Sequence, residues 1–161
     1  MNPEVPHRTP RKWADVFFDM AFMISQRSKD NSTQCGAVLV NQANVVLSTG
    51  FNGPPPQLND EEVPWNQRPE KYAYIIHADE NALLHALDSH GGKALIGSTM
   101  YLTAMPCTEC VLRMIRAQVG KVYVPSCYKP YALSKYQVPF DSLLEIQCRP
   151  KLSIEVVEYV R

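Results

Sequence analysis

The sequence has no excess of charge of either sign and no long hydrophobic run. Its 161 residues include 16 lysines and arginines against 16 aspartates and glutamates. Proteins that bind a long nucleic acid usually carry a basic excess, so this balance argues against such a partner and favours a small-molecule substrate. The longest apolar runs, such as residues 45–47, are far too short to span a bilayer, which argues against a membrane partner.

Cysteine is too scarce and too irregularly spaced for a disulfide framework. There are five cysteines, an odd number, and two of them form the C-x-x-C pair Cys107 and Cys110. One such pair beside three scattered cysteines indicates metal binding and free thiols in a reducing compartment. The N-terminal residues contain no apolar stretch resembling a signal peptide. We therefore expect a cytoplasmic location.

The predicted elements alternate between helices and strands. Residues 13–24 have the apolar spacing of one helical face, and the β-rich runs 35–40 and 45–48 predict a hairpin. Proline and glycine are so frequent over residues 50–72 that we expect a loop without regular structure. Beyond this loop the spacing predicts helices over 77–87, 107–118 and 140–146, and strands over 99–103, 121–124 and 154–159.

This alternation predicts an α/β fold in which helices pack on both faces of one sheet. The length suits one compact domain with a sizeable core. Residues 1–12 are polar and proline-bearing, so we expect them to form an N-terminal arm and residues 13–161 to form a single domain.

The strongest chemical signal is the cysteine pair. If Cys107 begins a helix, Cys110 lies one turn further on the same side, so both thiolates can bind one metal ion. The helix N-terminus favours their negative charge. A lone C-x-x-C pair can equally be a redox pair, half of a structural zinc site or two buried small side chains. A structural zinc normally needs four protein ligands, and the sequence has no second C-x-x-C pair.

His77 changes the balance between these alternatives. A single histidine is by default an ordinary core or surface residue, but this one opens a predicted helix directly after three apolar residues. Two helices that each follow the sheet can point their first side chains at one spot. One histidine and two cysteines leave the fourth tetrahedral position open, as in catalytic zinc sites. We therefore predict one catalytic Zn²⁺ site per chain, formed by His77, Cys107 and Cys110.

H-x-E followed by P-C-x-x-C is the signature of zinc-dependent deaminases, and the chain resembles the deoxycytidylate (dCMP) deaminases of the cytidine deaminase superfamily. The resemblance covers about residues 13–128 in register, and is carried by residues 26–30, 50–53, 63–65, 77–84 and 100–110. It implies a three-layer α/β/α cytidine-deaminase-like fold with a central mixed sheet of about five strands. It also implies a homo-oligomer.

The resemblance implies hydrolytic deamination of dCMP to dUMP in pyrimidine nucleotide metabolism. In this chemistry a zinc-activated hydroxide attacks C4 of the cytosine ring while a glutamate carries protons. The family motif for that glutamate is H-A-E-x-N-A. Because Asn81 and Ala82 set the register, Asp79 occupies the glutamate position in this chain.

Aspartate keeps the carboxylate but withdraws it by about 1 Å, a misplacement that can cost on the order of 100-fold in rate. Asp79 can be the proton shuttle, helped by a shift of its helix. Alternatively, the chain is a weak or inactive deaminase that binds nucleotide in a regulatory role. In a third interpretation Glu80 replaces Asp79, although it lies about 100° further around the helix. A deaminase of another cytosine or adenine substrate, including tRNA, is a further alternative.

The resemblance also implies substrate contacts outside the metal site. The sugar hydroxyl would meet Asn52, the exocyclic amine would face the backbone near Ala104, and the base would pack near Tyr128. The 5′-phosphate would meet Arg27, Ser28 and Lys29. Each of these residues also has an ordinary structural explanation, as a turn residue, a core or surface side chain, or a solvated basic helix end.

Some dCMP deaminases respond to dCTP and dTTP through a glycine-flanked turn. The matching residues here are Gly50, Asn52 and Gly53, so we expect effector binding in this region. Certain family members carry a second zinc in the loop that follows. Residues 54–72 contain no histidine or cysteine, which supports the prediction of one zinc per chain.

Overall fold

A five-stranded mixed sheet forms the centre of the computed structural model, which describes residues 9–128 and 151–159. The strands are β1 (Gly36–Val40), β2 (Val46–Phe51), β3 (Thr99–Leu102), β4 (Lys121–Pro125) and β5 (Ser153–Val157). They lie in the order β2-β1-β3-β4-β5. β1 is antiparallel to both of its neighbours, β2 and β3, whereas β3, β4 and β5 run parallel to one another.

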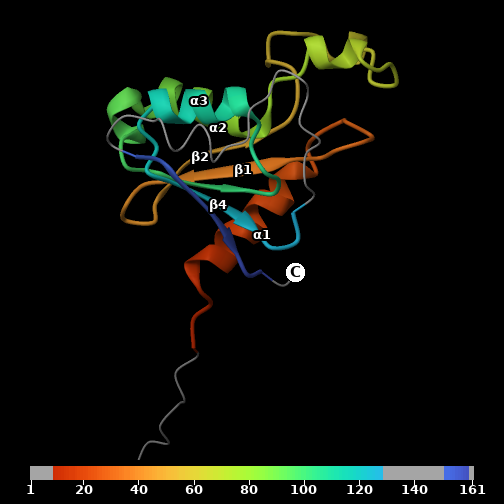
Figure 1. The fold of residues 1–161 in the computed structure, drawn as a ribbon. Coiled ribbons are helices and arrows are strands. Elements are labelled where there is room, and N and C mark those ends of the chain that lie inside the picture. The colour runs from red at the N-terminus through yellow and green to blue at the C-terminus, as the bar shows by residue number, and fades with distance from the viewer. Residues whose placement is uncertain (1–8, 129–150, 160–161) are drawn as a thin grey trace, which may run out of the picture.

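Three helices cover the two faces of this sheet (Figure 1). α1 (Trp13–Ser25) packs on one face, and α2 (Ala78–His90) and α3 (Thr108–Arg116) lie on the other. This arrangement confirms the predicted three-layer α/β/α fold with a mixed sheet of five strands. Among the described residues, no helix is long and apolar enough to cross a membrane.

Two hydrophobic core clusters lie on opposite faces of the sheet, and β1 contributes side chains to both. Val38 and Val40 pack with the buried residues of α1, whereas Ala37 and Leu39 pack beneath α2 and α3. Successive side chains of a strand point to opposite faces of a sheet, so an unbroken apolar strand is what a central position between two helical layers requires.

Gly50 lets β2 approach α2 without an intervening side chain. A Cβ atom at this position would lie 2.2 Å from the carbonyl oxygen of Ala78 and 2.5 Å from the amide nitrogen of Ala82. Two hydrogen bonds tie the same surfaces together: the Ser48 hydroxyl donates to the Ala82 carbonyl at 2.7 Å, and the Asn81 amide to the Phe51 carbonyl at 2.9 Å. These contacts therefore fix the position of the first turn of α2 relative to β2.

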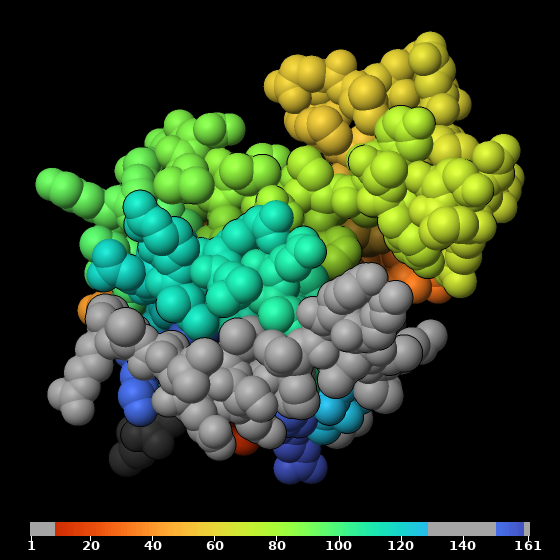
Figure 2. All heavy atoms as spheres, turned by 45° about the horizontal axis from the view of Figure 1, so that its top comes forward, coloured from red at the N-terminus to blue at the C-terminus, as the bar shows by residue number. Residues whose placement is uncertain are grey.

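The predicted loop over 50–72 is more regular than its composition indicates. β2 continues to Phe51, and two single-turn 3₁₀ helices, η1 (Asp60–Glu62) and η2 (Glu70–Ala73), lie within it. Such short turns depend on local caps and tertiary contacts, and Asn59 caps η1 by accepting a hydrogen bond from the Glu61 amide at 3.3 Å. The segment projects from the rest of the molecule (Figure 2). A third 3₁₀ helix, η3 (Gly92–Leu95), follows α2.

The other predicted helices and strands within the described residues are confirmed, with ends shifted by up to three residues. In α1, Phe18 is fully buried, whereas Trp13 at the start of the helix is 57% exposed. The predicted helix over 140–146 lies outside the described residues. The division into an arm (1–12) and a domain (13–161) stays a prediction, since residues 1–8 and 129–150 are not described.

Candidate metal centre

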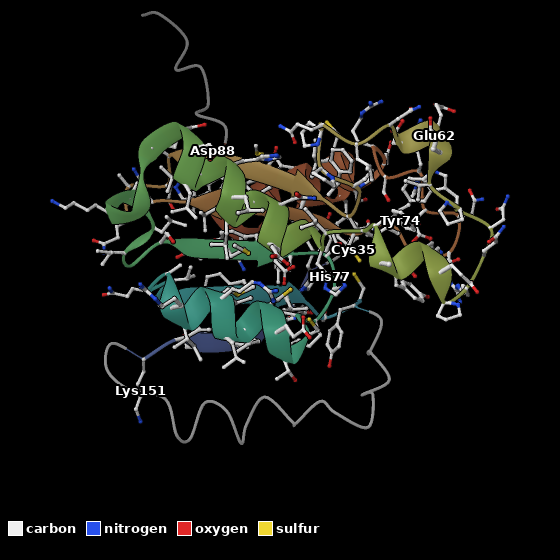
Figure 3. All side chains as sticks on the ribbon, turned by 90° about the horizontal axis from the view of Figure 1, so that it is seen from above. Cys35, Glu62, Tyr74, His77, Asp88 and Lys151 are labelled. Carbon is white, nitrogen blue, oxygen red and sulfur yellow. The ribbon has the colours of Figure 1, made fainter. Side chains whose placement is uncertain are left out.

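The three predicted metal ligands meet where α2 and α3 begin. His77 is the N-cap of α2, Cys107 is the N-cap of α3, and Cys110 lies within the first turn of α3. Neither N-cap side chain caps its own helix, although serine or aspartate at this position normally does so. Both side chains are thus available to a ligand. Figure 3 shows His77 at the α2 end that faces α3, with Asp88 toward the opposite end.

The backbone before His77 is held by a pair of hydrogen bonds to the end of β2. The Gly53 amide donates to the Ile76 carbonyl at 3.1 Å, and the Ile76 amide donates back to the Gly53 carbonyl at 2.9 Å. This isolated bridge fixes the direction in which the chain enters α2. The position of the imidazole is therefore set by the sheet.

The distances between the three ligand atoms fit a zinc ion. The Nδ1 atom of His77 lies 3.5 Å from the Sγ atom of Cys107 and 3.5 Å from that of Cys110. Zn–S bonds of about 2.3 Å and Zn–N bonds of about 2.0–2.1 Å at a tetrahedral angle imply an N···S separation of about 3.6 Å. All three ligand atoms lie within 4.8 Å of one another, and both cysteines are buried. No other such group of three ligands occurs among the described residues.

The electrostatic setting favours thiolate at this point. A hydrogen bond from the Cys110 thiol, supported by His77, lowers the pKa of Cys107 to about 4. The same contact and burial raise the pKa of Cys110, and the bond to Cys107 raises the pKa of His77. The N-termini of two helices add partial positive charge. A divalent cation can replace the two protons that these contacts now share.

A pocket of about 120 Å³ opens beside the metal ligands, with His77, Asp79 and Cys107 in its wall. Further lining residues come from loops, including Asp30, Thr33 and Asn52, and from Tyr72 in η2. Cys35 also lines the pocket and lies close to His77 in Figure 3.

Asp79 faces this pocket, whereas Glu80 does not. Asp79 is only 4% exposed, and its Oδ1 atom accepts a hydrogen bond from the Glu80 amide at 3.0 Å. Burial raises the pKa of Asp79 against the opposing effects of Cys110 and His77. The Glu80 carboxylate instead pairs with the Nε atom of Arg113 at 3.0 Å and lies outside the pocket lining. This placement favours Asp79 over Glu80 as the carboxyl group beside the metal.

Of the predicted substrate contacts, Asn52 and Ala104 line the pocket. The side chain of Asn52 also braces the wall, because its Oδ1 accepts from the Cys35 amide at 2.7 Å and its Nδ2 donates to the Thr33 carbonyl at 2.8 Å. Tyr128 packs against the core cluster under α2 and α3 and is not part of the pocket lining.

The predicted phosphate contacts do not line this pocket. The Ser28 hydroxyl donates to the Asn52 carbonyl at 2.7 Å. Lys29 pairs with Asp60 at 3.0 Å and with Glu61 at 2.5 Å. Arg27 is exposed and also lies outside the lining. The glycines of the predicted effector turn have structural roles, since Gly50 packs against α2 and Gly53 forms the bridge to Ile76.

Two features of the pocket wall were not predicted from the sequence. Asp30 and Tyr72 line the pocket, and Lys71 lies buried behind Asp30, to which it donates a hydrogen bond. Asp30 belongs to the segment 26–30 that carries part of the family resemblance, but Lys71 lies 41 residues away. The sequence offers only a weak signal for this pair, namely that Lys71 is the one lysine in the segment 50–72.

Comparisons with known proteins agree with this geometry. A family model described as "Cytidine and deoxycytidylate deaminase zinc-binding region" matches residues 11–126. The deoxycytidylate deaminases of Mus musculus and Homo sapiens are 35% and 34% identical over 116 residues, which is 69% of this chain. The chain spans about 63% of the length of these mammalian relatives.

Two further similarities come from a bacterium and from a solved structure. An uncharacterized deaminase of the luxG 3′ region in Aliivibrio fischeri is 40% identical over 114 residues, covering 71% of this chain and 73% of that protein. The crystal structure of dCMP deaminase from the cyanophage S-TIM5, in complex with dCMP and dUMP, superposes with a TM-score of 0.70 at 24% identity. It covers 94% of this chain and all of the phage chain, so the two share a fold.

We predict that Cys110→Ser reduces the zinc content of the purified protein from about one ion per chain to nearly none. Removing one of three protein ligands leaves too few to hold the ion. The matched control is Cys127→Ser, because Cys127 is an exposed free thiol outside the ligand group. Elemental analysis after dialysis measures both variants. Full zinc retention by Cys110→Ser would contradict the assignment.

Proposed function

The chain belongs to the cytidine and deoxycytidylate deaminase family, and from this we propose that it catalyses the zinc-dependent hydrolytic deamination of dCMP to dUMP. The observation that carries the proposal is the meeting of a three-ligand metal site and the buried Asp79 carboxyl group in one pocket. Three protein ligands are typical of a catalytic zinc, which keeps one position open for a reactant.

The size of the pocket supports a substrate with a single ring. A dry cavity of about 150 Å³ accommodates benzene, and the pocket here has about 120 Å³. This volume is on the scale of a single ring, as in a pyrimidine base. The named deoxycytidylate deaminases among the relatives support the cytosine nucleotide as that pyrimidine.

In the proposed reaction Asp79 carries the protons. When bound, the zinc lowers the pKa of a water molecule and so supplies a nucleophile near neutral pH. Asp79 takes the proton that this water loses and delivers it to N3 of the ring. It then moves the proton of the new C4 hydroxyl to the amino group, so that the C4 carbonyl forms as the C–N bond breaks and ammonia leaves. Burial raises the pKa of Asp79, and a carboxyl group with a raised pKa is better suited to hold and return a proton during the reaction. The backbone near Ala104 faces the exocyclic amine, and Asn52 contacts the sugar.

A substrate panel tests the proposal. We expect the zinc-loaded protein to release ammonia from dCMP, and not from dCTP, cytidine or an adenosine-containing RNA oligonucleotide. Nucleotide binding without release of ammonia would favour a regulatory protein of the same fold. Activity on the oligonucleotide would instead favour a tRNA deaminase. Adding dCTP or dTTP to the dCMP assay tests whether the turn at Gly50, Asn52 and Gly53 binds effectors.

Asp79→Asn should lower kcat by about 10²- to 10⁴-fold, the usual contribution of a general acid–base group, while zinc stays bound. Asp79→Glu then separates two interpretations of the natural aspartate. An increase of about 100-fold means that the shorter side chain limits the rate, whereas a decrease means that α2 already compensates for it. Asp88→Glu is the matched control, because it makes the same change on an exposed position of the same helix. Unchanged kcat in Asp79→Asn would contradict the assigned role.

The surface over α2 and α3 supports the proposal of a homo-oligomer. A groove between these helices exposes four large apolar side chains at 41–50%, namely Leu84, Leu87, Ile96 and Leu112. Charges of both signs, including Glu109 and Arg116, border it, so a second copy related by a two-fold axis can pair its rim with this one. Figure 2 shows the two helices side by side on this face.

We expect Leu87→Glu to shift the protein toward a smaller species in analytical ultracentrifugation, because it places a charge in the apolar interface. Leu58→Glu serves as the control, since Leu58 is similarly exposed at 39% but lies in the projecting loop. A monomeric wild-type protein at micromolar concentration would contradict the proposal. A cytoplasmic location is part of the proposed function, because Cys107, Cys110 and Cys127 are free thiols, as expected in a reducing compartment.

A further inference from the structure

A buried ion pair lies directly behind one wall of the pocket. The Nζ atom of Lys71 is 2.8 Å from the Oδ1 atom of Asp30, and the two side chains are only 1% and 4% exposed. Lys71 also donates to the Ser32 hydroxyl at 3.1 Å. Burying two charges is costly, and a well-packed apolar pair is often at least as stable. The pair therefore calls for an explanation other than stability.

Asp30 organises the wall on the pocket side of this pair. Its Oδ1 atom accepts hydrogen bonds from the amides of Ser32 at 2.8 Å and Thr33 at 3.2 Å. Although burial opposes ionisation, the bonds from Lys71 and from these two amides lower the pKa of Asp30. The Thr33 carbonyl then accepts from Asn52, whose Oδ1 accepts from the Cys35 amide. Hydrogen bonds thus run without a break from Lys71 to Asn52.

Lys71 anchors the other end of this network in the projecting loop. It lies in η2, its own amide donates to the Gln67 carbonyl at 3.1 Å, and its neighbour Tyr72 lines the pocket. Two outer contacts join the same segments: the amide of Asn31 donates to Asn66 at 3.1 Å, and Lys29 pairs with Asp60 and Glu61. The outer ion pairs are exposed and worth little. The pair of Lys71 and Asp30 is the buried part of this junction between residues 29–33 and the loop of residues 60–72.

We propose that Lys71 is a positioning residue for nucleotide binding. Acting through Asp30, it holds Thr33 and Asn52 against η2, so that the wall facing the nucleotide is formed before the ligand arrives. A preformed wall avoids the cost of ordering it on binding. The identity of the ligand rests on the proposed deaminase function, whereas the role of Lys71 in shaping the wall does not.

The first test is the variant Lys71→Met, assayed with dCMP. We expect KM to rise about tenfold, the equivalent of roughly one lost hydrogen bond to the ligand, while kcat and zinc content stay near their wild-type values. Asp60→Asn is the matched control, because it neutralises an exposed acid of the same junction and leaves Glu61 to pair with Lys29. It should change neither KM nor the melting temperature.

A second variant separates positioning from stability, since Lys71→Met leaves Asp30 unpaired and lowers the melting temperature. Asp30→Leu combined with Lys71→Met removes both charges and should recover much of the melting temperature. KM should stay raised, because neither Lys71 nor Asp30 then orders the segment of Ser32 and Thr33, whose amides donate to Asp30 in the wild type. If KM returns to the wild-type value together with the melting temperature, the pair only stabilises the fold and the proposal is overturned.

A third measurement does not depend on turnover. Amide hydrogen exchange at Ser32, Thr33 and Cys35 should be faster in Lys71→Met, which keeps the Asp30 acceptor, than in wild type, with exchange in β1 unchanged. Equal exchange in both proteins would overturn the role of Lys71 even if KM differs. If the wild-type protein does not deaminate dCMP at all, the proposed function fails, while faster exchange at these amides still supports the positioning role.

Discussion

The candidate site depends on one constraint: α2 and α3 begin close together on one face of the sheet, and the side chains at both N-caps are left free of capping hydrogen bonds. His77 and Cys107 occupy the N-cap positions of α2 and α3 and make no side-chain cap bond. A helix start normally satisfies some of its free amides with such a bond. Here the two helices lack the stabilisation that a side-chain cap provides, and the side chains of His77 and Cys107 point at one another instead. A metal ion gives this arrangement its energetic reason, because ligand bonds offset the missing caps.

The contact between β2 and α2 carries this constraint into the rest of the fold. At Gly50 the strand lies against the backbone of α2, and Asn81 ties the helix to the carbonyl of Phe51. The same short stretch of helix presents Asp79 to the pocket and Glu80 to Arg113. Packing thus decides which of two neighbouring carboxylates faces the metal site. An aspartate at this position is buried whether or not it carries protons efficiently.

Local patterns predicted the layers of the fold and the metal ligands well, and contacts between distant segments explain most of what they missed. The periodicity of α1 and the apolar run of β1 each depend on neighbouring residues. The assignment of Arg27, Ser28 and Lys29 to the phosphate came from the family resemblance and stays a prediction. In the structure Lys29 pairs with Asp60, which lies 31 residues away. The turns η1 and η2 form where composition favours a loop, because tertiary contacts hold them. No local pattern contains that information.

The buried pair of Lys71 and Asp30 also constrains how this sequence can change over time. Losing either partner alone leaves a charge in a dry environment, which is far more costly than losing both. Divergent relatives should therefore keep both residues or replace both, and chains that carry only one of them should be rare. We therefore expect these two positions, which lie 41 residues apart, to change together among relatives. This wall of the pocket can therefore change in evolution only when both residues are replaced together.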